Sequence, residues 1–456
     1  MITTVLAFIL TLGILIVVHE YGHYRVAVAC GVKVLRFSVG FGRVVWRRQA
    51  SPDATEFVIC ALPLGGYVRM LDEREDEVSP QEWDRAFNRQ PLRSRVAIVA
   101  AGPLANLALA VLLYAAAGWI GVDEPKAVLG PPAAGTPAHA AGLRAGDWVR
   151  AVSTDGVEWQ EVRSLNELRW TLTQTALESG SLRLSVTDRE GRGSREIRLD
   201  LRGQPVGEVD AAAMRRLGFG PAFSEPLLGE VKAGGPADQA GLRKGDRILA
   251  VDGEEVTDAQ TLRERIRAAL QDGQAREMRW RLQRDGRLME LAVVPRVIPE
   301  GERRVGRIDA FVGLPPELVT VRHGPLEGLV LGLERTWEVS SLTLRMIGRM
   351  IVGEASLKNL SGPLTIADFA GQSVQQGLAY YLGFLALVSV SLGVLNLLPL
   401  PMLDGGHLMY YFFEGITGRP IPELWMERLQ RGGIAVLLLM MSVALFNDVA
   451  RLLGLH

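Results

Sequence analysis

Four blocks of apolar residues divide this chain of 456 residues, and each is close to the length that crosses a lipid bilayer. A helix spans the hydrocarbon core with about 20 residues. A backbone in hydrocarbon must satisfy its own hydrogen bonds, so such blocks are predicted to be helices. They lie at residues 4–18, 96–122, 380–403 and 434–446 with its flanks. The stretch at about 123–310 is charged and interrupted by Gly and Pro, which is typical of a soluble insertion.

The distribution of basic residues predicts how these spans are oriented. The first block could be a secretory signal peptide, but the first four residues carry no basic group, and the first basic residue, Arg25, lies beyond the block. The segment after it is rich in Lys and Arg, so the positive-inside rule places that segment in the cytoplasm and the N-terminus outside. We therefore expect four spans in a lipid bilayer, with both chain ends and the soluble middle outside.

The overall charge and the cysteines exclude two classes of protein. The formal net charge is −1 and the isoelectric point is about 6.6, so nothing indicates a nucleic-acid partner. Both cysteines, Cys30 and Cys60, fall in the cytoplasmic loop, so the exported part is not a module held together by disulfides.

A metal-binding motif lies at the inner end of the first apolar block. Residues 19–23 read His-Glu-Tyr-Gly-His, an HExxH motif. Residues four apart lie on one face of a helix, so His19 and His23 can bind the same zinc ion. Glu20 is placed to polarise a water on that metal. The two histidines could instead merely cap the polar end of a helix. The membrane-length apolar setting favours a zinc hydrolase that cuts within or beside the bilayer.

The third apolar block ends in a second candidate segment, NLLPLPMLDGGH, at residues 396–407. Spans one and three run in the same direction, so their inner ends lie at similar depth. Prolines and glycines end the helix where Asp404 emerges. A catalytic zinc commonly has three protein ligands, and an ionisable group in a membrane is a functional candidate, so Asp404 is predicted to be the third ligand. His407 is the alternative ligand, although a role outside the metal shell is equally natural for it.

Short β-prone runs fill the loop between the first two spans, at residues 37–48, 56–62 and 63–70. They predict a small sheet at the inner membrane surface. A substrate in a transmembrane helix hides its peptide carbonyls in its own hydrogen bonds, and an exposed strand edge can hold an unwound segment by strand addition. We expect residues 58–70, including Gly65, Gly66 and Tyr67, to bind substrate in this way. The alternative is a hairpin with a structural role only.

The soluble middle contains an internal repeat. Residues 135–147 (GTPAHAAGLRAGD) recur as residues 235–246 (GPADQAGLRKGD), and an apolar strand with an Asp-Gly turn follows each copy. Asp147 and Asp246 are 99 residues apart, which is one domain length. Further on, residues 326–351 have helical apolar spacing but too many charges to span a membrane. This amphipathic helix suits the outer membrane surface, and packing against the soluble insertion is the alternative.

The HExxH motif, the NLLPLPMLDGGH motif and the expected topology together resemble the site-2 protease family of intramembrane zinc metalloproteases, including its bacterial RseP-type members. The resemblance implies that His19, His23 and Asp404 bind one Zn²⁺ ion and that Glu20 is the catalytic base. It also implies a role in substrate handling for Asn396, for which a helix–helix hydrogen bond is the alternative.

Two further strings carry the resemblance. The string GPLAN at residues 102–106 matches a family signature, although small-residue packing with a proline kink explains it equally well. The pattern AGLxxGD followed by a strand and Asp-Gly resembles the circularly permuted PDZ domain of bacteria, which binds extended peptides or C-termini. The first copy lacks the tight Val-Asp-Gly turn of the second, which puts its peptide binding in doubt. The resemblance implies that the two domains exclude substrates with bulky outer domains. The alternatives are a structural spacer or a docking site for a partner.

The predicted fold class is a polytopic α-helical membrane protein with four transmembrane helices, a small membrane-associated β-sheet and two inserted α+β PDZ domains. The predicted boundaries are transmembrane helix 1 with HExxH at 1–24, a cytoplasmic β-rich loop at 25–95, transmembrane helix 2 at 96–121, periplasmic PDZ domains at 122–221 and 222–310, the amphipathic helix and a connecting loop at 311–375, transmembrane helix 3 at 376–404, a cytoplasmic loop at 405–430 and transmembrane helix 4 at 431–456.

The predicted function is that of a zinc endopeptidase of the bacterial inner membrane that cleaves single-span proteins near the cytoplasmic leaflet. By the resemblance, its substrates are an anti-sigma factor already trimmed outside and leftover signal peptides. A PDZ scaffold without enzymatic activity would explain the insertion but not two ligand motifs that converge at one depth. A metal transporter would need polar residues along several spans.

Overall fold

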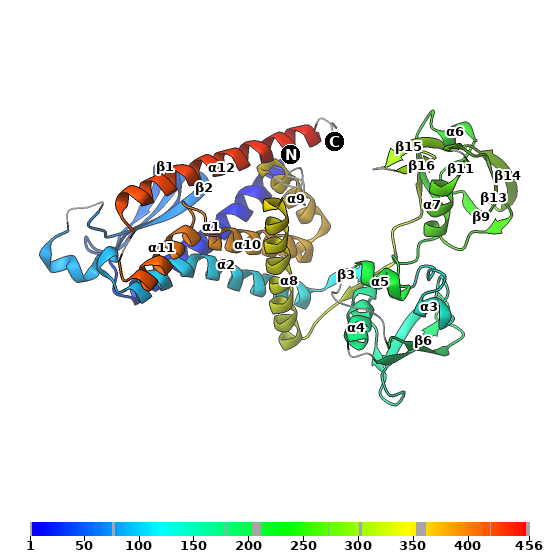
Figure 1. Cartoon of the computed structure of the whole chain (residues 1–456), viewed down its shortest axis with the longest axis horizontal. Coiled ribbons are helices and arrows are strands. Elements are labelled where there is room, and N and C mark those ends of the chain that lie inside the picture. The colour runs from blue at the N-terminus through cyan, green and yellow to red at the C-terminus, as the bar shows by residue number, and fades with distance from the viewer. Residues whose placement is uncertain are drawn as a thin grey trace. The chain divides into compact units, whose positions relative to one another are not determined.

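The computed structural model divides into two units (Figure 1). One unit comprises Met1–Val122 and Arg322–His456, and the other comprises Asp123–Val321. The residues that the structure describes are 2–74, 78–177, 180–202, 211–271, 273–300, 303–352, 362–419 and 421–452.

The first unit is mainly helical, and the part of it that the structure describes contains four helices long and apolar enough to cross a membrane. This confirms the expectation of four candidate spans. They are α1 (Ile2–Ala29), α2 (Leu92–Ile120), α10 (Leu378–Leu397) and most of α12 (Glu423–Leu452). The helix α12 begins at Glu423 rather than at residue 431, because its first two turns mix apolar residues with Glu and Arg and so do not continue the uninterrupted apolar run of the span.

The predicted third span and the loop after it need correction. The helix α10 ends at Leu397, and the range 405–430, expected to be a loop, contains the 14-residue helix α11 (Asp404–Thr417). The two glycines that follow Asp404 masked this helix in the sequence. They are needed for a close approach, since a Cβ on Gly405 would lie 2.1 Å from the carbonyl oxygen of Leu398.

The helix α2 is the element against which four other helices of this unit pack. It contacts α1, α10, α11 and α8. The contact with α1 is a close backbone approach, because a Cβ on Gly22 would lie 2.4 Å from the carbonyl oxygen of Ala101. Small residues allow such approaches between membrane helices. As a result, the helix with the HExxH motif and the helices around Asp404 meet at one common neighbour.

The predicted amphipathic helix is present as α8 (Pro325–Ile351), and it packs on α2 through glycines. A Cβ on Gly332 would lie 2.4 Å from the carbonyl oxygen of Val111, and one on Gly328 would lie 2.3 Å from the Trp119 indole nitrogen. The sequence pattern identified the helix but not this partner, since a contact made through glycine leaves no apolar side chain as a signal.

The helix α9 (Pro363–Gln376) is held at its start by the last helix of the chain. The carboxylate of Asp448, which is 1 % exposed, accepts hydrogen bonds from the backbone N–H groups of Gly362, Leu364 and Thr365 and from the Thr365 hydroxyl. These N–H groups have no partner within the helix, so a carboxylate at this end satisfies them and also complements the helix dipole.

The loop between α1 and α2 forms the predicted small sheet, built from β1 (Val34–Arg48) and β2 (Glu56–Met70). Residues 36–39 of β1 are partnered on one side by residues 66–69 of β2 and on the other by residues 56–59. Residues 46–48 of β1 also pair with residues 57–59. The two long strands therefore bend back on themselves, and the outer edges of the sheet lie at residues 66–69 and 46–48. Two short 3₁₀ helices, Pro80–Arg85 and Phe87–Arg89, lead from the sheet into α2.

The two sequence repeats form two sheets with the same strand order. In the first repeat β4 (Trp148–Ser153) and β6 (Ser181–Thr187) are central between β5 (Gln160–Glu161) and β7 (Arg195–Asp200). In the second, β9 (Arg247–Val251) and β13 (Met278–Arg284) are central between β10 (Glu254–Glu255) and β14 (Arg287–Val293). Each repeat encloses its own apolar core.

The remaining helices and short strands belong to the two repeats or pair where the chain enters and leaves the unit. The helices are α3 (Pro137–Ala140), α4 (Leu165–Leu177), α5 (Ala211–Leu217), α6 (Pro236–Gln239) and α7 (Ala259–Ala268). The short strands are β8 (Leu228–Val231), β11 (Leu270–Gln271), β12 (Gln274–Ala275), β15 (Arg296–Glu300), β16 (Arg303–Arg307) and β17 (Ala310–Val312). The strand β3 (Val122–Pro125) pairs with β18 (Leu318–Val321), so the chain enters and leaves this unit side by side.

The Asp that ends each Gly-Asp motif has the same structural role in both repeats. Asp147 and Asp246 are both buried. Each carboxylate accepts a hydrogen bond at 2.8 Å from the backbone N–H three residues before it, and each pairs with an arginine, Arg195 in the first repeat and Arg284 in the second. A buried carboxylate needs such partners, so the two ion pairs fix equivalent turns.

The turns after the two motifs differ, as the sequences do. In the second repeat Asp252 adopts a left-handed conformation with φ of 53° beside Gly253. In the first repeat the turn is wider, and the Asp155 carboxylate accepts hydrogen bonds from the backbone N–H groups of Val157 and Glu158. These two hydrogen bonds, with a third from the Ser153 hydroxyl, lower the pKa of Asp155 below its ordinary value.

Candidate active site

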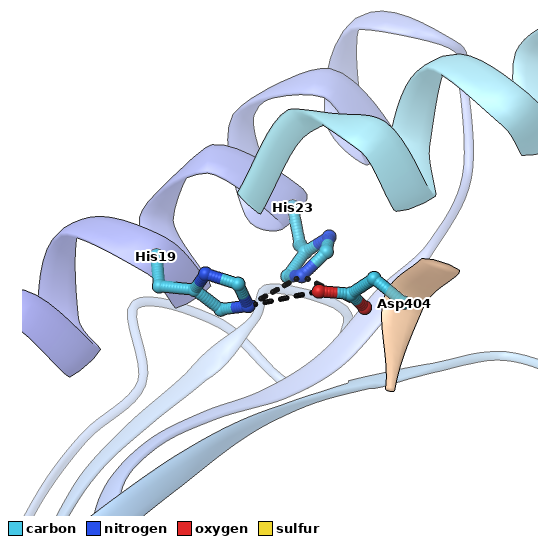
Figure 2. Close-up of side chains that lie close together, drawn as sticks. All are labelled: His19, His23 and Asp404. Carbon is cyan, nitrogen blue, oxygen red and sulfur yellow. Dashed lines mark hydrogen bonds and ion pairs between the residues drawn. The ribbon is translucent and has the colours of Figure 1, made fainter. Parts of the chain in front are cut away.

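Three side chains from two distant parts of the chain meet at one point. Figure 2 shows the imidazoles of His19 and His23, from one helix, converging with the carboxylate of Asp404 from another. The Nε2 atom of His19 lies 3.1 Å from Oδ2 of Asp404, and the Nε2 atom of His23 lies 3.5 Å from Oδ1. The two Nε2 atoms are 3.2 Å apart. All three groups are at least half-buried, so the donor atoms face one another rather than water.

The spacing of these three donors fits a zinc ion. Zinc bonds to His nitrogen and carboxylate oxygen are about 2.0–2.2 Å long in tetrahedral sites, which separates neighbouring donor atoms by about 3.3–3.5 Å. The three separations here, 3.1, 3.2 and 3.5 Å, match the edges of such a tetrahedron. Three protein donors leave the fourth position for water or substrate, as in catalytic zinc sites. His407 is not one of the three donors that meet. Its ring instead lies edge-on to Tyr410.

The ring of His23 is oriented by the backbone of α2. Its Nδ1 atom lies 2.8 Å from the carbonyl oxygen of Ile98, and a carbonyl can only accept, so Nδ1 carries the proton. The lone pair is therefore on Nε2, which faces His19 and Asp404. A hydrogen bond of this kind fixes both the tautomer and the ring plane of a metal-binding histidine.

Asp404 is the first residue of α11, and an ion pair anchors that helix to α2. Both guanidinium nitrogens of Arg95 reach the carboxylate of Glu414, at 3.1 and 2.5 Å. The two side chains are only 16 % and 19 % exposed, so the pair is largely shielded from water. A two-point contact of this kind restrains orientation as well as distance, and it holds α11 at a fixed place on α2.

Two residues of the GPLAN string lie against the two histidines. A Cβ on Gly102 would lie 2.2 Å from Nε2 of His23, so only glycine leaves room for that imidazole. Asn106 is 1 % exposed, and its Nδ2 atom lies 3.4 Å from Nδ1 of His19. The sequence contained a signal for this pairing, since Gly102 and Asn106 are four residues apart, as His19 and His23 are. The sequence did not show that the two faces meet.

The catalytic glutamate predicted from HExxH lies between the histidines and the sheet. The backbone N–H of Val68 is hydrogen-bonded to the Glu20 carboxylate. A Cβ on Gly66 would lie 3.2 Å from Cγ of Glu20 and 2.9 Å from a methyl group of Ile16. Residues 66–68 of β2 therefore pass directly beside this carboxylate, and a side chain at position 66 would crowd it.

The other residues predicted to bind substrate lie slightly further along the sheet and on α10. Gly65 has φ of 108° and leaves space for the ring of Phe41, which also stacks on Tyr67 at a centroid distance of 6.1 Å. The Tyr67 hydroxyl accepts a hydrogen bond from Arg36. Asn396 is half-buried in the last turn of α10, eight residues before Asp404.

Comparison with known proteins agrees with this site. The model of peptidase family M50 matches residues 7–440. The regulator of sigma-E protease RseP of Escherichia coli is 38 % identical over 460 aligned positions, which cover 98 % of both chains. A Ralstonia nicotianae protein named as a zinc metalloprotease is 43 % identical over 469 positions, which cover 99 % of both chains. A Neisseria meningitidis protein with the same designation is 40 % identical over 463 positions, covering 99 % of this chain and all of the relative. The chain therefore belongs to peptidase family M50, and it is a zinc-dependent metalloprotease.

Proposed function

We propose that the protein is an intramembrane endopeptidase of the bacterial inner membrane that hydrolyses single-span membrane proteins near the cytoplasmic leaflet. The main support is the position of the donor cluster. His19 and His23 lie within α1, a helix of membrane-spanning length, and Asp404 follows α10, another such helix. A hydrolytic centre at this depth is suited to a substrate that is itself a membrane helix.

In this proposal His19, His23 and Asp404 hold the zinc ion, and Glu20 is the general base. Zinc, when bound, polarises the scissile carbonyl and makes water a stronger acid. The Glu20 carboxylate takes the proton of the attacking water and delivers it to the leaving amine nitrogen. The hydrogen bond from the Val68 backbone N–H holds the Glu20 side chain on the sheet side of the histidines. Asn396 is proposed to contact the substrate backbone near the scissile bond.

We further propose that residues 66–69 of β2 hold the substrate as an added strand. The support is that one side of this segment pairs with β1, while the Val68 N–H points to Glu20. A peptide paired along this edge would have its backbone extended, with its carbonyls no longer hidden in a helix. Gly65, Gly66 and Tyr67 lie at the start of this edge. The missing side chain at position 66 lets this strand run close to Glu20 and Ile16.

Proline substitution tests the strand edge. Backbone N–H groups two residues apart point to the same side of a strand, so Met70→Pro removes a donor from the same edge as Val68 without touching Glu20. We expect slower cleavage with unchanged zinc content. Arg47→Pro, on the opposite edge of the same sheet, is the matched control. Equal cleavage by the Met70 variant and the control would rule out this edge as the substrate site.

The insertion is proposed to be a pair of periplasmic PDZ domains that act as a size filter. The repeated sheet order and the buried, arginine-paired Asp at the same place in each repeat support two related domains. Because β3 and β18 pair, a short Gly/Ser linker can replace Asp123–Val321 without separating the chain ends. We expect that deletion to allow cleavage of reporters with a large folded outer domain, which the intact protein rejects. A deletion protein that binds zinc but cleaves no reporter would contradict the filter and favour a docking role.

The class of substrate is proposed from the names of the relatives. Several are named regulator of sigma-E protease, which points to a membrane-bound anti-sigma factor as substrate. Remnant signal peptides are a second class with the same single-span form.

The first experiment is cleavage of a tagged single-span reporter, without an outer domain, by the purified protein in detergent. We expect cutting by the wild type and by Glu334→Gln, an exposed carboxylate of α8, but not by Glu20→Gln. Zinc content should be equal in all three. Equal cutting by Glu20→Gln would refute the assignment of the base. Cutting by none of them, with zinc bound, would favour a peptide-binding scaffold.

A further inference from the structure

Asn106 is a buried polar side chain on α2 for which the reaction has no direct use. Only 1 % of it is exposed. Its Nδ2 atom lies 3.4 Å from Nδ1 of His19, the ring nitrogen that faces away from the donor cluster. Its Oδ1 atom is buried and has no hydrogen-bond partner among the residues that the structure describes. Because Oδ1 has no partner there, no hydrogen bond to it fixes which end of the amide faces His19.

The state of His19 in a zinc site decides which end of the amide must face it. If Nε2 of His19 gives its lone pair to the metal, the single proton of the neutral ring is on Nδ1. An Nδ1–H group needs an acceptor, and the amide nitrogen of Asn106 is a donor. Rotation of the amide by 180° exchanges Oδ1 and Nδ2 without changing the packing, because the two ends have the same shape. The oxygen then accepts from His19.

We infer that Asn106 is a positioning residue for the zinc ligand His19, with its Oδ1 atom accepting the Nδ1–H hydrogen bond in the metal-bound protein. This inference rests on the proposed metal site. It gives the asparagine of the GPLAN string a chemical role, as a hydrogen-bond acceptor for His19. It also makes α2 the common support of both histidines, since Ile98 of the same helix accepts from His23.

The backbone around Asn106 is held firmly enough for this task. The hydroxyl of Ser389, fully buried on α10, donates to the carbonyl oxygen of Asn106 at 2.7 Å. The asparagine therefore lies where α2 is tied to α10, the helix that leads to Asp404. An acceptor fixed in this way restrains the plane of the His19 ring and raises its basicity as a ligand.

The two histidines differ in how this support can be tested. The acceptor for His23 is a backbone carbonyl, which no substitution removes. The acceptor for His19 is a side chain. Asn106→Leu keeps the approximate shape and removes the acceptor, whereas Asn106→Asp keeps an acceptor and makes it stronger. Loss of a hydrogen-bonding partner of a metal ligand typically weakens metal affinity 10–100-fold.

The experiment is a zinc titration of the full-length purified protein against a competing chelator, together with the visible absorption spectrum of the Co²⁺-substituted protein. We expect Asn106→Leu to bind zinc 10–100-fold more weakly and to show an altered cobalt spectrum. Asn106→Asp should bind zinc at least as tightly as the wild type. Thermal unfolding of the metal-free protein should be similar for the wild type and for the Leu variant.

Three outcomes would overturn the inference. One is wild-type zinc affinity in Asn106→Leu. The second is weakened zinc binding in a folded Asn106→Asp, and this variant decides the question if the Leu variant does not fold. The third is an equal loss of affinity in Ser389→Ala, which would mean that packing rather than the amide matters. His19→Ala separates this inference from the metal site itself, because zinc binding that survives His19→Ala would refute the ligand assignment instead.

Discussion

The substitution of Gly102 by Ala offers the sharpest test of how the site is built. The added methyl group would lie 2.2 Å from Nε2 of His23 and 2.7 and 2.8 Å from two ring carbons. Non-bonded heavy atoms are comfortable at about 3.5 Å or more, so the imidazole must move by about 1.3 Å. The zinc bonds of a histidine tolerate only about 0.2 Å of displacement. A movement of this size also strains the hydrogen bond between Nδ1 of His23 and the carbonyl oxygen of Ile98.

The expected result is a loss of zinc without a loss of fold. We predict at least a 100-fold weaker zinc affinity, which corresponds to about 2.8 kcal/mol. Alanine is a better helix former than glycine by about 1 kcal/mol, so the helix itself should not be weakened. Cleavage should fall in proportion to the zinc that is lost, and excess zinc should restore part of it.

The matched control is Gly13→Ala, a glycine of α1 with no atom within 4 Å of an added Cβ. It should keep the zinc affinity and the cleavage rate of the wild type. Chelator competition and the reporter assay measure both variants side by side. Wild-type zinc affinity in Gly102→Ala would refute the proposed packing of His23 on α2, and the metal site would have to be reconsidered.

Three further predictions follow from ion pairs and hydrogen bonds elsewhere. Glu414→Gln breaks the two-point contact with Arg95, so it should lower the free energy of unfolding by about 1–3 kcal/mol, and a charge swap of the two residues should restore part of this in thermal denaturation. Asp448→Ala removes four hydrogen bonds at the start of α9 and should cost about 1–2 kcal/mol; faster amide hydrogen exchange at Thr365 checks this, and unchanged exchange would contradict it. The pKa of Asp155 is lowered by backbone hydrogen bonds, so its contribution to the first repeat should be complete above its ordinary pKa of about 3.9 and lost as the pH falls below that; an NMR titration, with Asp155→Asn as the pH-independent control, measures it.

Local sequence patterns predicted the structure where one physical rule decides it. Apolar length alone predicts α1, α2, α10 and α12, because a lipid-exposed backbone has no alternative to the helix. The four-residue spacing of His19 and His23 predicts that they share a face of α1. Alternation and glycine punctuation predict the sheet of β1 and β2. The recurring Gly-Asp motif predicts two equivalent domains, and the two sheets have the same strand order.

Local sequence patterns did not predict the contacts that one helix or strand makes with another. The helix α11 was missed because its first turn contains two glycines, which lower helix propensity but allow the approach to Leu398 that places Asp404. The partner of α8 was missed because glycines make that contact. For the GPLAN string the sequence left packing and function equally open. The structure shows that Gly102 packs on His23 and that Asn106 lies beside His19.

The sequence by itself determined the number of candidate spans, the shared helical face of His19 and His23, and the candidacy of Asp404. These follow from spacing and hydrophobicity within single segments. Only the tertiary structure decided that Asp404 rather than His407 joins the histidines, and that residues 66–68 lie beside Glu20. The reason is physical: donor separations of 3.1–3.5 Å are set by how α1 and α11 both pack on α2, and that packing depends on close approaches between backbones that no local pattern encodes.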